Sequence, residues 1–326
     1  MLESIPLTST IDIILQTISA LPMSQILMIS GLPIVLLMAL MEWWYFRGTD
    51  KFESKDSLAS IMMGGGYLIV AEGFVVVAVV LPFFDWAYQF RLMTIEMTTL
   101  NLIGLALLVD FLFYLFHLTA HRVRFLWAVH EVHHASECFN YTVAFRQSVM
   151  YSFFGAYIFF LPAILLGFPT EWVMGVLAVN LLIQIWVHTQ AIGHLSPVVE
   201  WLFNTPSNHR VHHARNPRYI DRNMGGVLMI WDHLFGTYVA EDPTEQPEFG
   251  VVSQVGKPTS YNPVTLTFRE FGQIIRDVSR PGSMSMRLKH LWGRPDWKRP
   301  EDIAPSDKVK SNSKDVEQGL PSTVSH

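Results

Sequence analysis

Long apolar runs separated by short charged loops dominate the first 188 residues of the chain. A helix needs about 20 mostly apolar residues to cross a bilayer, so each run of that length predicts a membrane span. The predicted spans are residues 26–46, 61–81, 98–117, 149–168 and 172–188. A shorter run at residues 7–20 predicts an interfacial or packing helix. The pattern therefore predicts an all-α, polytopic membrane helical bundle of about four to five spans.

The pattern changes after residue 194, where polar positions are interleaved with Trp, Phe and His. This mixture predicts a helical, histidine-rich cap on the membrane surface. Residues 263–292 have the spacing of an amphipathic helix with basic residues, which would face either anionic lipid or solvent. The predicted parts are an N-terminal interfacial segment (1–25), a transmembrane bundle with the first histidine clusters (26–194), a cytoplasmic cap with the third cluster and the amphipathic segment (195–299), and a disordered tail (300–326).

Lys and Arg residues are concentrated in every second loop. Three lie in the 47–57 loop, only Arg91 lies in the 82–97 loop, and three follow the third predicted span. Short loops rich in Lys and Arg favour the cytoplasmic side. The sequence therefore predicts an external N-terminus, with the histidine clusters and the C-terminus cytoplasmic, in a bacterial inner membrane or the endoplasmic reticulum.

Composition supports a membrane protein and excludes several other classes. The 326 residues are 50% hydrophobic with a mean hydropathy of +0.28, and the net charge of −5 gives no sign of a nucleic-acid partner. A single cysteine, Cys138, excludes disulfides within the chain and iron–sulfur clusters held by cysteine. The first 46 residues contain no Lys or Arg, so no cleavable signal peptide is expected.

The pattern H-x-x-H-H occurs twice, at residues 130–134 and 209–213. On a helix, positions i, i+3 and i+4 share one face, so each copy directs three imidazoles to one place. An H-x-x-x-H pair precedes them, and one further histidine ends the last apolar run. Nine imidazoles are too many for one tetrahedral site and suit two neighbouring metals. The predicted ligands are His117, His121, His130, His133, His134, His188, His209, His212 and His213. The histidines without this spacing are His194, His233, His290 and His326.

Polar side chains within the third and fifth spans form stripes that run toward these histidines. Asp110 and Tyr114 share a helical face with His117, and Asn180 and Gln184 share one with His188. Such groups either orient the ligating imidazoles or join helices to each other. Glu72 lies midway along the second span. We expect its carboxylate either to line a cavity or to be protonated.

Other classes of function compete with an oxidative metal centre. Residues 130–134 also satisfy H-E-x-x-H, the pattern of zinc hydrolases in which Glu131 would be the general base. The second copy has Arg210 at that position, and a zinc-dependent membrane hydrolase leaves most of the other histidines unexplained. A metal transporter would bury its ligands near the bilayer midplane, whereas these lie at span ends. A non-enzymatic metal- or lipid-binding membrane protein is the remaining alternative.

The histidine clusters between apolar runs resemble the fatty acid hydroxylase and sterol desaturase superfamily of membrane di-iron oxygenases. Residues 127–148, 188–189, 203–213 and 223–237 are similar to its alkylglycerol monooxygenase branch. The resemblance implies an oxidoreductase in which the nine histidines hold two iron ions, and which uses dioxygen to hydroxylate or desaturate a C–H bond of a membrane lipid. Glu137 and Asn223 lie in these segments, and they join Asp110, Asn180 and Gln184 as candidates that support the ligands.

An oxygenase of this kind needs electrons from outside the chain, because no flavin or cluster motif is present. The expected donor is a ferredoxin or a b-type cytochrome with its reductase. Arg122 and Asn208 depart from the branch, where Glu and a further His are expected. Tetrahydrobiopterin is therefore a weaker expectation than a protein donor, and ether-lipid cleavage of the alkylglycerol monooxygenase type is the alternative activity.

Overall fold

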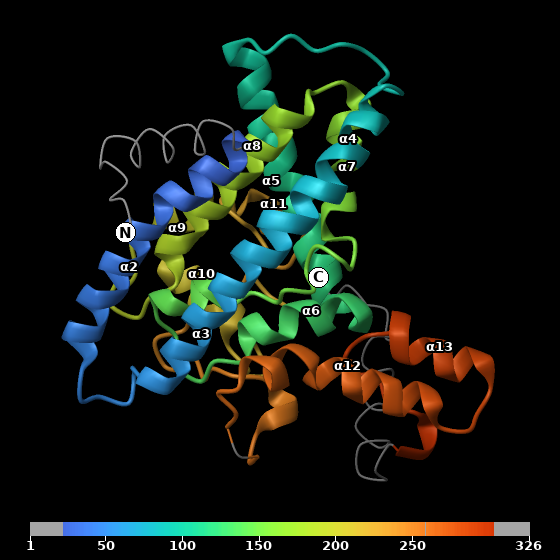
Figure 1. The fold of residues 1–326 in the computed structure, drawn as a ribbon. Helices are drawn as coiled ribbons and strands as arrows, with labels where there is room; N and C mark the ends of the chain where they lie inside the picture. Colours follow the sequence, from blue (N-terminus) through green and yellow to red (C-terminus); the bar gives the residue numbers. More distant parts are fainter. Residues whose placement is uncertain (1–21, 258, 303–326) are drawn as a thin grey trace, which may run out of the picture.

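The protein is built from long helices packed side by side, with short helices packed around them (Figure 1). The computed structural model describes residues 22–257 and 259–302. The described residues contain no strand beyond an isolated bridge between Phe203 and Leu228. The predicted all-α class is therefore confirmed. The predicted interfacial helix at 7–20 and nearly all of the predicted tail lie outside the described residues.

Four helical stretches are long and apolar enough to cross a membrane. They are Gln25–Phe46 within α2 (Met23–Phe46), Ser54–Tyr88, Thr99–Arg122 (α5) and Thr170–Val187. The second stretch joins α3 (Ser54–Gly66), the π-helix η1 (Tyr67–Val80) and α4 (Leu81–Tyr88), and the fourth joins α8 (Thr170–Ile183) to the 3₁₀ turn η4 (Gln184–Val187). α8 packs against both α2 and α5. The chain is an integral membrane protein with a number of spans inside the predicted range.

The predicted span at 149–168 is wrong as a single helix. Turns at 149–155 lead into a 3₁₀ turn, η3 (Ala156–Phe160), and the short helix α7 (Leu161–Leu166). Gly155 has a left-handed backbone (φ +78°), and Pro162 lacks the amide that a continuing helix would use. The segment nevertheless runs along α5 and ends beside α4, where the Leu92 amide donates to the Leu165 carbonyl at 2.7 Å.

The largest core packs α5, α7 and α8 against one another. Leu105 and Val109 of α5 pack with Ile164 of α7 and Val173 of α8, and all four are fully buried. Burying a side chain of this size stabilises the fold by about 1.5–3 kcal/mol. The relative placement of α5 and α8 matters because histidines lie at the end of each.

Short helices gather around the second half of α5 and beyond its end (Figure 1). They are α6 (Arg124–His134), η2 (Tyr141–Phe145), α9 (Pro197–Leu202), α10 (Pro206–His213) and α11 (Ile230–Phe235). α10 starts where the sequence favours it, because Pro206 occupies the first turn and the Thr205 hydroxyl accepts from the Asn208 amide. The division of the chain at residues 26, 195 and 300 remains a prediction.

The predicted amphipathic helix at 263–292 is broken into α12 (Pro263–Ser279) and α13 (Met284–Trp292), with the short turns η5 (Val252–Gln254) and η6 (Pro300–Asp302) on either side. The break contains Pro281, which cannot donate to a helical carbonyl, and Gly282, whose φ is +152°. α12 packs against α6, and Arg269 forms an ion pair with Glu131 at 3.0 Å. Arg269 therefore faces the protein instead of lipid or bulk solvent.

Candidate metal centre

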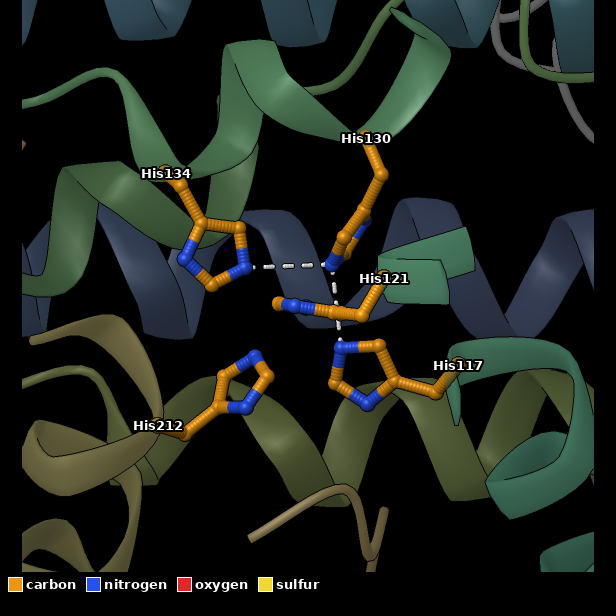
Figure 2. A group of neighbouring side chains, drawn as sticks. All are labelled: His117, His121, His130, His134 and His212. Atoms are coloured by element: carbon orange, nitrogen blue, oxygen red, sulfur yellow. Dashed lines mark hydrogen bonds between the residues drawn. The ribbon is translucent and has the colours of Figure 1, made fainter. Parts of the chain in front are cut away.

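All nine predicted histidines are buried and converge in two adjoining groups. Within each group, one ring nitrogen of every member lies within 4.8 Å of the others. The first group is His117, His121, His130, His134 and His212, whose rings point toward one another in Figure 2. The second group is His133, His188, His209 and His213.

Each H-x-x-H-H copy supplies side chains to both groups, and the group that receives two side chains from one copy receives one from the other. On α6, His130 and His134 point to the first group and His133 points to the second. On α10, His209 and His213 join the second group, and His212 joins the first. Each helix therefore contributes its i, i+4 pair to one group and its i+3 residue to the other, which explains why the spacing occurs twice.

The nitrogen–nitrogen distances match those of neighbouring ligands on one metal. The Nε2 atoms of His117 and His130 are 3.0 Å apart, and those of His188 and His209 are also 3.0 Å apart. The separations are 3.2 Å between His130 and His134 and 3.3 Å between His133 and His188. Metal–imidazole bonds of about 2.0–2.1 Å place adjacent nitrogens about 3.0–3.4 Å apart. The residues present therefore fit metal ions in both groups.

Three ring nitrogens in the cluster support the same conclusion. The Nε2 atoms of His121, His212 and His213 are buried and have no hydrogen-bond partner among residues 22–257 and 259–302. Buried polar atoms are nearly always paired, so the unpaired nitrogens of His121 and His212 in the first group and of His213 in the second require an explanation. Metal ions bound between the rings would satisfy all three.

Burial favours the neutral form of the six cluster histidines on α6 and α10. Burial lowers the pKa of His130, His134 and His212 well below its ordinary value, and the neighbouring imidazoles lower it further. The same causes act on His133, His209 and His213. A neutral imidazole has a free lone pair, which is the form that binds metals.

Backbone carbonyl oxygens fix the rings from behind. The Nδ1 atom of His117 is 2.9 Å from the Met224 carbonyl, that of His212 is 3.0 Å from the Arg222 carbonyl, and that of His188 is 3.0 Å from the Gln184 carbonyl. A carbonyl can only accept, so Nδ1 carries the proton in each ring and Nε2 keeps the lone pair. Sequence spacing gives no signal for these acceptors, because Met224 is 107 positions from His117.

Asn223 acts on the cluster through this loop, which its side chain holds by hydrogen bonds to backbone groups. Its φ is +54°, and its side-chain amide donates to the carbonyls of Asn208 (3.0 Å) and Val239 (2.8 Å). The residues on either side of it, Arg222 and Met224, supply the two carbonyls that meet His212 and His117. Asn223 therefore anchors the loop that orients a histidine from each end.

The polar stripes of the third and fifth spans meet each other behind the cluster. The Asp110 carboxylate accepts from the Asn180 amide (2.8 Å), the Val227 amide (2.9 Å) and the Trp231 indole (2.9 Å). The Gln184 side chain donates to Asn180 at 2.7 Å, and the Gln184 carbonyl meets His188. These residues join helices and the 222–231 loop, and only Gln184 contacts a cluster histidine.

Several other predicted positions lie away from the two groups. Glu137 is exposed and accepts from Thr259, and Glu72 accepts from the hydroxyls of Tyr67 and Tyr157 inside the bundle.

The partners of the excluded histidines are Glu241 for His194, the Trp201 carbonyl for His233 and Arg299 for His290. His326 lies outside the described residues. The two departures from the branch pattern also face elsewhere: Arg122 is exposed, and the Asn208 side chain donates to the carbonyls of Glu200 and Phe203.

Asp221 is a site residue that the sequence did not indicate. Its carboxylate lies 3.5 Å from Nδ1 of His121, and its other oxygen accepts from Arg294 at 2.6 Å. The backbone of Asp221 is left-handed, with φ +56°, a conformation that Asp adopts more readily than most residues. Among the described residues it is the one carboxylate paired with a cluster histidine, and a carboxylate in this position orients a metal-binding imidazole.

Glu131, the base of the competing zinc-hydrolase hypothesis, is committed to another partner. It is 1% exposed, and burial raises its pKa to about 7 although Arg269, at 3.0 Å, opposes that shift. The carboxylate therefore ties α6 to α12 and lies in a structural ion pair.

Comparisons with known proteins agree with this geometry. Residues 102–237 match the family model described as Fatty acid hydroxylase, and this range contains all nine histidines. The chain is 39% identical to alkylglycerol monooxygenase of Danio rerio over 189 residues, which are 58% of this chain and 41% of the relative. It is 42% identical to the human alkylglycerol monooxygenase over 166 residues, 51% of this chain and 36% of the relative.

A bacterial protein extends the comparison to another lipid. The ornithine lipid hydroxylase of Rhizobium tropici is 27% identical over 150 residues, 46% of this chain and 45% of the relative. The chain thus spans less than half the length of these three relatives. No solved structure matches the chain. The resemblance seen in the sequence to the fatty acid hydroxylase family is confirmed.

Proposed function

We propose that the protein is a di-iron membrane oxygenase that hydroxylates a C–H bond of a lipid, because residues 102–237 match the fatty acid hydroxylase family model. The observation that carries this proposal is the pair of buried histidine groups, five and four side chains, at the end of the spans. Donor sets made only of imidazole suit iron, copper or zinc. The relatives named monooxygenase and hydroxylase favour a redox-active metal over zinc, which has no redox chemistry, and the resemblance seen in the sequence implies iron.

The proposed reaction needs two metals, dioxygen and external electrons. When two iron ions are bound and reduced, they supply the activation of dioxygen. The overall reaction consumes one C–H bond, one O₂, two electrons and two protons, and gives one C–OH group and one water. The electrons would come from a ferredoxin or a b-type cytochrome with its reductase, because the sequence contains no flavin or cluster motif.

The chain's own contribution is to position the ligands and exclude water. Backbone carbonyls and Asp221 hold the imidazoles by Nδ1 and leave Nε2 free for the metals that they would bind, so the ligands would need no reorientation during turnover. Val132 and Val211 lie on the two helices that carry the H-x-x-H-H copies. They are 1% and 0% exposed, so apolar side chains close to the histidines are shielded from water. A site with little water protects a reactive oxidant from side reactions.

An ether lipid is the second candidate substrate. It is supported by the higher sequence identity to the relatives named alkylglycerol monooxygenase. The chain is 39–42% identical to two proteins named alkylglycerol monooxygenase and 27% identical to the ornithine lipid hydroxylase. Hydroxylation of a carbon bonded to an ether oxygen gives a hemiacetal, which breaks into an aldehyde and an alcohol. The same site would thereby cleave an ether bond. Zinc-dependent hydrolysis is disfavoured, because Glu131 is held by Arg269.

The proposal places the histidine cluster and the C-terminus on the cytoplasmic side. Its support is the excess of Lys and Arg in the 47–57 loop and around the histidine segments. A cytoplasmic site is also where a soluble electron donor and its reductase would reach the metals.

Lipid mass spectrometry on membranes with and without the protein tests this function. Isotopically labelled dioxygen should place one labelled oxygen in a lipid product, or in an aldehyde released from an ether lipid. A product that has lost two hydrogens and gained no label would show desaturation. Unlabelled hydrolysis products, formed equally without dioxygen, would contradict an oxygenase.

A further inference from the structure

A groove of about 680 Å³ runs along the second half of α2. It lies against the start of η2 and the segment that follows His188. Its lining includes Met38, Met41, Trp44, Tyr45, Tyr141 and Ala191. The volume falls in the range of sites that bind small molecules, about 300–1,000 Å³.

The outer wall of the groove faces the bilayer. α2 is one of the candidate spans, and Met41, Trp44 and Tyr45 are 56%, 63% and 65% exposed. Trp and Tyr are typical of the membrane–water interface, and the Arg47 guanidinium lies over the Trp44 ring at 5.3 Å. The medium at the mouth of this groove is therefore lipid, with headgroups near Trp44 and chains near Met38.

Glu42 is the single charged residue in the described lining, and it is not available to a headgroup. It is 3% exposed, and its two oxygens accept from the Thr189 hydroxyl and from the Tyr141 amide. Glu42 thus joins α2 to the segment after His188. The rest of the surface offered to an occupant is apolar or aromatic, which suits hydrocarbon and disfavours a charged peptide.

The inner side of the groove lies close in sequence to residues that contact the second histidine group. Thr189, the partner of Glu42, follows His188 directly in the chain. Tyr141 lies two residues after Phe139, whose ring centroid is 5.7 Å from that of His188 and 5.0 Å from that of His213. The Gln190 side chain also donates to the Phe139 carbonyl at 3.0 Å. Phe139, Thr189 and Gln190 therefore connect the lining of the groove to the second histidine group.

We propose that this groove binds the hydrocarbon chain of a membrane lipid and leads it from the bilayer toward the group His133, His188, His209 and His213. The inference rests on the proposed function for the identity of the reaction, but chain binding is measured separately from oxidation. A lipid is the occupant because the groove opens on a spanning helix, has an apolar surface and adjoins the candidate oxidative site.

Photo-crosslinking tests the proposal with palmitic acid that carries a diazirine on its chain, in phosphatidylcholine nanodiscs. Adducts mapped by mass spectrometry should concentrate on Met38, Tyr141 and Ala191. Met41→Trp fills the groove and should reduce the adducts on Tyr141 and Ala191 several-fold. The matched control is Leu37→Trp, because Leu37 is 57% exposed on the same helix and does not line the groove. Metal content should be unchanged in both variants.

Three outcomes would overturn the proposal. Adducts spread evenly over bilayer-facing side chains, including Leu37, would mean that the groove has no preference for the chain. Adducts on Tyr141 that persist in Met41→Trp would place the bound lipid elsewhere. Disulfide-linked dimers of a Met41→Cys variant, together with an absence of adducts, would assign the groove to a second copy of the protein. A failed oxygenase assay with groove adducts intact would instead count against the proposed function alone.

Discussion

The carboxylate of Asp221 gives the sharpest test of how the chain prepares its ligands. Asp221→Asn removes the charge facing Nδ1 of His121, 3.5 Å away, and keeps the shape of the side chain. Asn also tolerates the left-handed backbone found at this position, where φ is +56°. The variant should therefore fold, and its effect should be confined to His121 and to the ion pair with Arg294.

The expected magnitude follows from the role of the carboxylate. A carboxylate behind a metal-binding imidazole fixes the tautomer and makes the ring a stronger donor, and losing it costs about 10–100-fold in metal affinity. That range equals about 1.4–2.7 kcal/mol. The upper part of the range is expected, because the Asp221 side chain is only 18% exposed and solvent screens the contact weakly.

Competition with a chelator, followed by elemental analysis of the protein, measures the affinity. Asp296→Asn is the matched control, since Asp296 pairs with the same Arg294 at 3.2 Å and is 76% exposed. Asp221→Asn should release metal at a lower chelator concentration than the native protein, and Asp296→Asn should not. Equal metal retention by the two variants would refute the assignment of Asp221 as a positioning residue.

Three further predictions concern α6, the membrane topology and the donor. Glu131→Gln should keep both metals and lower the melting temperature. The reason is that it weakens a buried ion pair with Arg269, which contributes about 1–3 kcal/mol to stability. Loss of metal would mean that Glu131 serves the site directly. Reporter tags in the 47–51 turn and at the C-terminus should be cytoplasmic, and a tag at Arg91 should be external. If the tags in the 47–51 turn and at the C-terminus lay on opposite sides of the membrane, the topology would be contradicted. Turnover of purified protein should require a reductase with ferredoxin or a b-type cytochrome, and robust turnover with tetrahydrobiopterin alone would exclude the donor argued from Arg122.

The sequence was sufficient to predict the helical class and the convergence of the histidines, because both depend on local spacing. Apolar runs of spanning length become helices, and i, i+3, i+4 histidines share a helical face wherever the helix lies. The division of each copy between two groups could not be predicted. It depends on how α6 and α10 approach each other, which is set by packing in three dimensions.

The errors and omissions have equally physical causes. Hydropathy cannot distinguish a continuous span from the 149–168 segment, where Gly155 and Pro162 interrupt the helix. The carbonyl of Met224 and the carboxylate of Asp221 are about 100 positions from the histidines they contact, so no periodicity records them. Groups that orient a ligand from a distant loop become visible only once the chain is folded.

Metal content in histidine variants tests the central claim, that the two groups bind separate metals. His212→Ala removes a member of the first group and His133→Ala one of the second. His233→Ala is the control, since His233 lies outside both groups and bonds the Trp201 carbonyl. Elemental analysis should find two iron ions per chain in the native protein and in the control, and fewer in each of the other variants, with lipid oxidation abolished in both. A fully metallated and fully active His212→Ala protein would contradict the di-iron centre.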